Sequence, residues 1–279
     1  MLIAPVLWST AGVVTRHVER AQPFEQVFWR SLVAAVFVAL VLIFSKRKQD
    51  IFNRPALFSG AMWAVMFTAF VVALSLTTVA NTLVVMSVAP LLTAFLSFVI
   101  LKEAVSARTW LAAGAAAAGI AWMFHDGFVG GHLIGMLIAA LIPLASAANL
   151  VMLRAAAARV DLVPAIMLGG FLSALLALPL ALPFQASAKD LALLAFLGVF
   201  QLGVPCMLLV IASRTLRPPE IALLSLLEVV LGPLWAWLGA GEAPGNAVLY
   251  GGGIVLAALV LNEISTLREK THISSEKPV

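Results

Sequence analysis

Two charged side chains lie within otherwise apolar stretches of the chain, and they are the residues best suited to chemistry. Glu228 falls about eight residues into an apolar segment, and Arg30 falls about two turns into another. A charged side chain at such a depth in a bilayer is costly, so it usually faces a cavity or a partner. Glu228 could contact a substrate ammonium group or act as a proton-coupled gate, or it could be a protonated or hydrogen-bonded acid that braces its helix at Pro233. Arg30 could bind a carboxylate through two hydrogen bonds, pair with Glu25 or reach toward the outer headgroups.

Neutral polar and aromatic side chains at similar depth complete the candidate site. Trp8 and Trp63 lie in mid-segment, where they line a cavity or pack within the bundle. Asn149 is the amide nearest mid-membrane, whereas Asn81 fits a helix cap equally well. Hydroxyl groups at these depths usually bond between helices or back to their own backbone. The candidate substrate-binding residues are therefore Trp8, Ser9, Arg30, Trp63, Thr82, Asn149 and Glu228.

The other tryptophans considered lie near segment ends. Such positions are typical of the aromatic belt at a membrane interface. These residues are Trp29, Trp110, Trp122 and Trp237.

Catalytic and metal-binding groups are sparse in the apolar segments. An intramembrane enzyme needs paired carboxylates, a Ser/His pair or a metal cluster, and Glu228 has no histidine at comparable depth. His125, Asp126 and His132 form the best metal-binding candidate, but they fall in an outer loop, where solvation is the simpler interpretation. Cys206 is the only cysteine, so an internal disulfide and a thiolate metal cluster are both excluded. We expect no enzyme activity, no metal and no cofactor.

Ten apolar segments must position these side chains. Hydrophobic residues make up 63% of the 279 positions and charged residues 11%, against roughly 45–50% and 25% in soluble domains. Strand-like alternation is absent, so the segments are predicted to be helices that span a bilayer. The fold class is therefore all-α, a polytopic membrane protein with ten transmembrane helices. Their approximate ranges are 2–15, 24–45, 54–74, 80–100, 107–124, 131–153, 162–184, 190–213, 220–239 and 244–264.

The positive charges are distributed unevenly about these segments. Thirteen of the 17 Lys and Arg residues fall on one side, Arg30 falls within a segment, and only Arg16, Arg20 and Lys189 fall on the other side. The positive-inside rule then predicts a multi-pass protein of the bacterial inner membrane with both termini in the cytoplasm. No charged region precedes the first segment, so we expect no cleavable signal peptide. Basic patches interleaved with aromatic residues are missing, which argues against nucleic acid as a partner.

An internal repeat organises the segments into two halves. Glu103 and Glu242 correspond at an offset of 139 residues, and each lies between an apolar segment and a segment rich in small residues. Five helices per repeat is an odd number, so the second half must enter the membrane from the opposite side. Such inverted repeats place a substrate site near the bilayer midplane between the halves. The predicted units are 1–128, 129–265 and a cytoplasmic tail, 266–279.

Several motifs give the chain a family resemblance over nearly its whole length. They are PVLWST (5–10), PFEQVFWRS (23–31), VAP (88–90) running to LKE, and LLEVVLGPLWAWLGAGE (226–242). With these motifs the chain resembles the drug/metabolite transporter superfamily with two EamA-type repeats, and most of all the YddG-like amino-acid exporters. The resemblance implies ten helices with cytoplasmic ends, a central cavity and export of small metabolites. The intramembrane acid belongs to one repeat only, because Ala89 corresponds to Glu228.

These observations predict a secondary transporter that exports small neutral metabolites, above all aromatic and other neutral amino acids. Alternating access of the two halves would carry the substrate, and Pro90, Pro205 and Pro233 would break helices near it. Proton coupling and facilitated diffusion both remain open. The alternatives are an exporter of lipophilic cationic drugs that uses Glu228 and, from another class, an intramembrane enzyme. The expected partners are a small-molecule substrate and membrane lipids, and we expect a monomer rather than a dimer.

Overall fold

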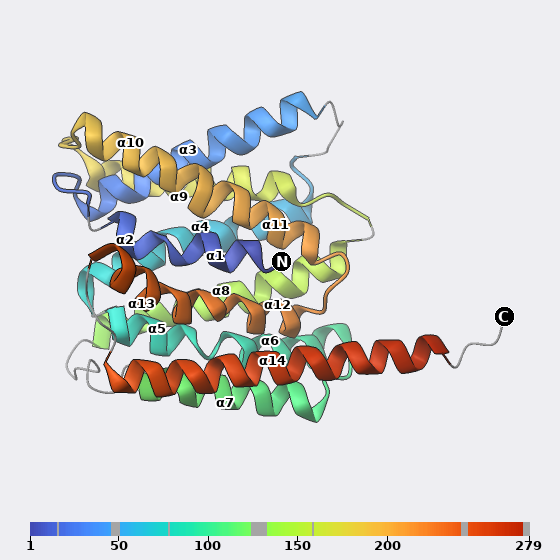
Figure 1. Cartoon of the computed structure of the whole chain (residues 1–279). Coiled ribbons are helices and arrows are strands. Elements are labelled where there is room, and N and C mark those ends of the chain that lie inside the picture. Colours follow the sequence, from blue (N-terminus) through green and yellow to red (C-terminus); the bar gives the residue numbers. More distant parts are fainter. Residues whose placement is uncertain are drawn as a thin grey trace.

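The computed structural model describes residues 1–15, 17–45, 51–77, 79–123, 133–157, 159–240 and 245–275. Every regular element in these ranges is helical, and all ten expected segments coincide with helix. The helices run back and forth along a common axis, with α3 and α7 at opposite edges (Figure 1). Six segments are continuous: α3 (Pro23–Phe44), α4 (Arg54–Leu76), α7 (Ala107–Met123), α8 (Leu133–Ala156), α9 (Val163–Ala181) and α14 (Asn246–Ser275).

The other four segments are interrupted. Two of them contain a π-helical stretch, η1 (Ser97–Leu101) or η3 (Leu197–Gly203), within an otherwise α-helical run. The α-helical pieces are α1 (Ile3–Ser9) with α2 (Ala11–Thr15), α5 (Val79–Met86) with α6 (Ala89–Leu96), α10 (Ala188–Phe196) with α11 (Val204–Ala212), and α12 (Pro218–Ser225) with α13 (Leu227–Ala240).

Among the described residues, six helical stretches are long and apolar enough to cross a membrane, judged by length and composition. They are Pro23–Phe44, Arg54–Leu76, Thr82–Leu101, Leu133–Ala156, Val163–Ala181 and Ala188–Ala212. Shorter apolar helices cover Ile3–Thr15 and Asn246–Asn262. The chain therefore has the all-helical architecture of a polytopic membrane protein.

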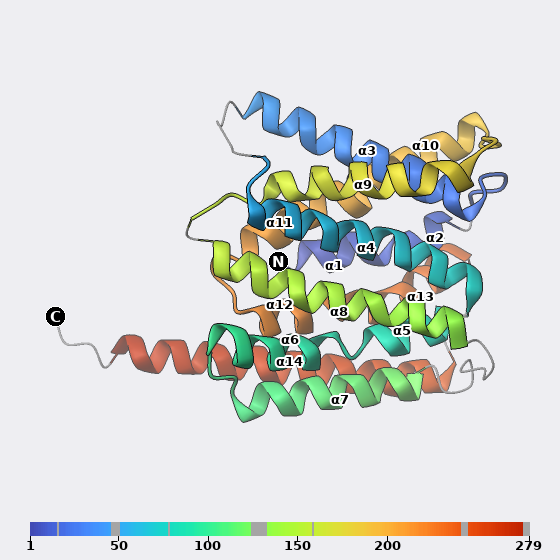
Figure 2. The ribbon, with the colours of Figure 1, turned by 180° about the vertical axis from the view of Figure 1, so that it is seen from behind.

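Close helix packing depends on small residues. A Cβ atom on Gly169 would lie 2.4 Å from the Cβ of Trp63, and one on Gly170 would lie 2.7 Å from the carbonyl oxygen of Ser31. These contacts bring α9 directly against α4 and α3, as Figure 2 shows from behind for α4 and α9. At the other edge α7 packs on α14, where a Cβ on Gly119 would lie 2.9 Å from the carbonyl oxygen of Gly251.

Three of the four interruptions occur where a serine hydroxyl bonds back to its own helix. Ser9 and Ser87 each donate to the carbonyl oxygen three residues earlier at 2.6 Å. Ser225 donates to the carbonyl oxygen four residues earlier at 2.8 Å. Such bonds compete with the backbone ladder and bend helices. Backbone bonds at Leu226 also tighten to a three-residue spacing.

The prolines behave in three ways. Pro90 follows the break at Ser87 and cannot donate a hydrogen bond to the carbonyl one turn earlier, so it interrupts its segment as predicted. Pro205 follows η3, where the segment widens into a π-helix and continues. The helix continues through Pro233, and the break expected there lies instead at Leu226.

Several residues named in the sequence analysis lie outside the described ranges. They are Arg16, Glu242 and the metal-binding candidate His125, Asp126 and His132.

Candidate functional site

Arg30 is a buried cation without a counter-ion among the described residues. It projects from α3 and is 4% exposed. Its Nη1 donates to Oε1 of Gln201 and its Nη2 to the carbonyl oxygen of Phe67, each at 3.3 Å, while Nε has no partner in the described part of the chain. An uncompensated buried charge is unfavourable, so this guanidinium is suited to receive an anion.

Glu25 does not pair with Arg30. The carboxylate of Glu25 is fully buried and accepts hydrogen bonds from the backbone amides of Gln185 and Ala186, each at 2.9 Å. It also accepts one from the indole of Trp29 at 3.3 Å. The pairing considered from sequence is therefore replaced by a bond to the loop before α10.

Cys206 belongs to the same apolar cluster as Trp63, against which Trp8 packs. Its thiol is buried beside the indole of Trp8 and within electrostatic reach of both Arg30 and Glu228. Sequence reasoning considered this cysteine only for redox and metal chemistry and missed its position. Packing between helices far apart in the chain creates that position, so no local sequence signal reveals it.

Glu228 lies in the first turn of α13, two residues after the break at Leu226. Its side chain is half-buried, and its carboxylate has no hydrogen-bond or ion-pair partner in the part of the chain that the structure describes. A negative charge near a helix N-terminus is favoured by the helix dipole.

Trp235 joins the site although sequence reasoning passed over it. Its indole donates to the hydroxyl of Ser9 at 2.8 Å and so ties α13 to the end of α1. Trp235 follows Glu228 by seven residues, which is two helical turns. That spacing places both side chains on one face and could have identified Trp235.

Trp63 is 4% exposed and contributes to the apolar wall of the site. Its ring lies 5.5 Å from that of Phe67 in a tilted arrangement, and Trp8 packs against the same apolar cluster. The indole N–H of Trp63 has no acceptor within the described ranges. This side chain therefore both packs in the core and leaves a buried donor open.

The contacts of Asn149 and Thr82 given by the structure lie elsewhere in the bundle, not at Arg30. Asn149 accepts a hydrogen bond from Ser59 at 2.6 Å, which joins α8 to α4. Thr82 is fully buried in α5, which packs on α8. The side chain of Asn81 lies outside the described residues. Trp8, Ser9, Arg30, Trp63 and Glu228 thus form the candidate site, with Gln201, Cys206 and Trp235 in addition.

A small pocket reaches Arg30 from one end of the bundle. Its volume is about 140 Å³, whereas pockets for drug-sized ligands measure roughly 300–1,000 Å³. Among the described residues no group of three His, Cys, Asp or Glu side chains could hold a metal ion. The pocket, called here the outer pocket, is lined by Thr15, Pro23, Gln26, Arg30, Phe70, Val71, Leu74, Ser75, Leu194 and Leu197.

Comparisons with known proteins give a family and a fold. Residues 1–125 and 133–263 each match the EamA-like transporter family. A protein of known crystal structure superimposes with a TM-score of 0.79 at 18% sequence identity, covering 92% of this chain and 93% of that one. At this identity the likeness concerns the fold alone. No curated protein matches the chain.

Proposed function

The chain belongs to the EamA-like transporter family of the drug/metabolite transporter superfamily, and we propose that it exports aromatic and other neutral amino acids. As a multi-pass membrane protein of this family it is a transporter of small molecules. The finer proposal is a secondary transporter in which the substrate crosses through a central cavity by alternating access. Either a substrate gradient or a proton gradient would drive export.

One observation carries the choice of substrate. Arg30 is a base and Glu228 an acid, neither has an ion-pair partner among the described residues, and both lie within electrostatic reach of Cys206. A neutral amino acid has a carboxylate and an ammonium group on adjacent atoms. Binding of such a zwitterion would supply Arg30 with an anion and Glu228 with a cation. Trp8 and Trp63 would then contact the apolar side chain of the substrate.

The proposed architecture has ten transmembrane helices in two inverted halves, 1–128 and 129–265, followed by the tail 266–279. The breaks at Ser87 and Leu226 support the repeat, because their separation equals the 139-residue offset between Glu103 and Glu242. Interrupted helices at corresponding positions of two repeats point to a substrate site. We place the chain in a bacterial inner membrane with both termini in the cytoplasm, as a monomer that needs no cofactor.

Transport by the purified chain in liposomes tests this function. The panel should contain labelled neutral, acidic and basic amino acids and a lipophilic cation, each measured with and without a pH gradient. We expect saturable uptake of neutral amino acids, reduced at least about tenfold by Arg30→Gln. The same substitution at exposed Arg20 is the matched control and should leave uptake unchanged.

Other outcomes would favour the alternatives. A cationic drug would be repelled by Arg30, so cation transport that rises in Arg30→Gln and disappears in Glu228→Gln would replace amino-acid export by drug export. Cleavage of a peptide or lipid by the chain would indicate an intramembrane enzyme instead.

A further inference from the structure

The outer pocket has two walls of different construction. One wall consists of α2, α3 and the run from α10 into η3, and it contributes Thr15, Pro23, Gln26, Leu194 and Leu197. The other wall is the second half of α4. Arg30 of the candidate site also lines the pocket, so the pocket connects that site with one end of the bundle.

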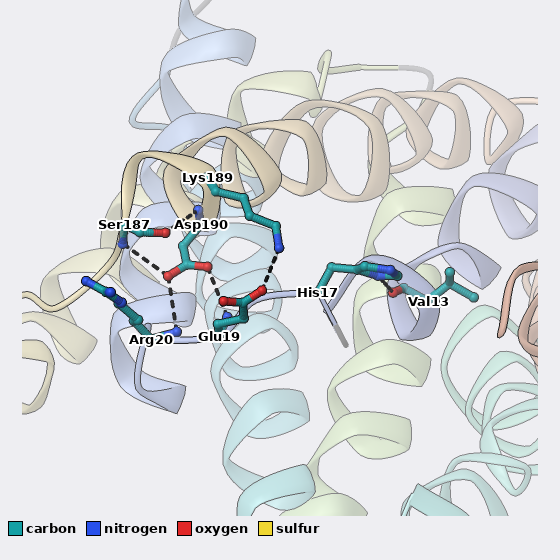
Figure 3. Close-up of polar contacts among 7 residues, drawn as sticks. All are labelled: Val13, His17, Glu19, Arg20, Ser187, Lys189 and Asp190. Atoms are coloured by element: carbon teal, nitrogen blue, oxygen red, sulfur yellow. Dashed lines mark hydrogen bonds and ion pairs between the residues drawn. The ribbon is translucent and has the colours of Figure 1, made fainter.

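Asp190 ties the first wall together at its rim (Figure 3). This carboxylate, in the first turn of α10, is fully buried and accepts hydrogen bonds from the backbone amides of Glu19 at 3.0 Å and Arg20 at 3.1 Å. It also accepts from the amide of Ser187 at 3.0 Å. Beside it the Nζ of Lys189 pairs with the carboxylate of Glu19 at 2.6 Å on the surface. The loop before α3 is thus bound to the start of α10.

Glu25 makes the reverse connection. It lies in the first turn of α3, and its buried carboxylate accepts from the amides of Gln185 and Ala186 in the loop before α10. Each of the two helices therefore holds the loop that precedes the other. We call Glu25, Asp190 and the amides that they bind in the opposite loop the rim clasp.

The four side chains of α4 that line the pocket make no comparable bonds in the described part of the chain. Phe70 and Val71 contact the first wall and α9 through an apolar cluster that includes Val27 and Ala177. The hydroxyl of Ser75 donates to the carbonyl of Val72 in its own helix. Among the described residues, the pocket-lining side chains of α4 make no hydrogen bond to α3 or α10. Apolar contacts are non-directional, whereas hydrogen bonds to buried carboxylates require one geometry.

Hydroxyl groups hold α4 at a deeper level. The hydroxyl of Ser173 in α9 lies 3.0 Å from that of Thr68 in α4 and 3.1 Å from that of Ser31 in α3. This cluster joins three helices at Thr68, two residues before the first pocket-lining residue of α4. The end of α4 beyond Thr68 is therefore the part that could swing away from this hydroxyl cluster.

We infer that the substrate leaves through the outer pocket and that the end of α4 beyond Thr68, residues 69–76, is the moving side of the outer gate. The rim clasp keeps α3 and α10 together throughout the transport cycle. This inference rests on the proposed transport function and adds its exit route. It assigns Phe70, Val71, Leu74 and Ser75 to the gate.

Two pairs of introduced cysteines can test which wall of the pocket moves during transport. Glu19→Cys with Lys189→Cys joins the rim clasp across an existing contact and keeps every backbone donor of the clasp. Gln26→Cys with Ser75→Cys spans the pocket between α3 and α4. Both pairs are introduced into a Cys206→Ala background, so that a short membrane-impermeant bifunctional thiol reagent, added from outside, meets only the introduced cysteines. Each unbridged double variant is its own control for transport.

Bridging should leave transport unchanged for one pair and reduce it for the other. The clasp pair should transport at the rate of its unbridged form, and the pair across the pocket should lose at least about tenfold. Loss of transport on bridging the clasp, or full transport with the pocket bridged, would overturn the inference.

Hydrogen exchange of the unmodified chain in lipid gives a second test that does not depend on transport. The amides of Glu19, Arg20, Gln185 and Ala186 should exchange slowly with and without a neutral amino acid. Fast exchange of these amides would show that the clasp opens and would overturn the inference even if transport is confirmed. If the chain transports no amino acid and the amides remain protected, the substrate proposal fails while the fixed rim stands.

Discussion

The interrupted pairs α5/α6 and α12/α13 occupy corresponding positions of the two halves, yet only one of them carries an acid. Their breaks lie at Ser87 and Leu226, and at the same offset Ala89 corresponds to Glu228. Pro90 supports the first break, whereas no proline follows Leu226 within one turn. A break therefore forms with or without an acid. The break belongs to the architecture, and the acid marks the half that would bind a charged group.

The two interrupted pairs also differ in the contacts made after the break. After its break, α13 is tied to α1 by Trp235 and Ser9, and Glu228 lies within electrostatic reach of Cys206. The first break instead leads into α6, whose Thr93 donates to the carbonyl oxygen of Ala89 in its own helix. Substitutions at corresponding positions can therefore separate what the breaks do from what the acid does.

Loss of the acid should have the largest effect. Glu228→Gln keeps the shape of the side chain and removes its charge, so transport of a neutral amino acid should fall by more than about a hundredfold, equivalent to about 3 kcal/mol. The measurement is the initial rate of uptake into liposomes at equal amounts of folded protein. Glu103→Gln is the matched control, because the pair of Glu103 with Arg154 is partly exposed and should contribute less than about 1 kcal/mol. Similar losses in both variants would remove the special role of Glu228.

Adding an acid to the other break should cost stability without creating a site. Ala89→Glu introduces a carboxylate into an apolar helix, and a cost of about 2.5 kcal/mol is expected for a charge at membrane depth. The yield of folded protein and its thermal stability should fall, and Glu228→Ala should not be rescued by Ala89→Glu. Rescue would mean that the two breaks are functionally equivalent.

Much of this architecture could be predicted from the sequence, because apolar runs of about twenty residues have one solution in a bilayer. All ten expected segments are helical, and the break near Pro90 follows from its missing N–H. For the other pair the sequence predicts a break at Pro233, whereas the helix breaks at Leu226. The hydrogen bond from the Ser225 hydroxyl to its own helix depends on a side-chain rotamer that the sequence does not specify. The position of Cys206 depends on the packing of helices far apart in the chain.

The link between α13 and α1 should have an intermediate effect. Trp235→Phe removes the hydrogen bond to Ser9, which should lower the free energy of unfolding by about 1 kcal/mol and transport by about fivefold. Trp237→Phe is the control, because Trp237 is 47% exposed on the same helix. Thermal unfolding in detergent and uptake in liposomes measure the two effects. Equal behaviour of the two variants would mean that the bond to Ser9 does not position α13.

The hydroxyl groups at the breaks should have the smallest effect, and one break should respond more than the other. Ser225→Ala removes the bond to the carbonyl oxygen of Ile221, so the backbone near Leu226 can straighten, and transport should fall about twofold with stability changed by ~0.5 kcal/mol or less. Ser87→Ala should change transport less, because Pro90 still prevents a continuous ladder there. Hydrogen exchange of the amides around each break, measured with uptake, decides between them. Equal responses would mean that the hydroxyl groups do not shape the breaks, and the functional difference between the halves would then lie in Glu228 and its surroundings alone.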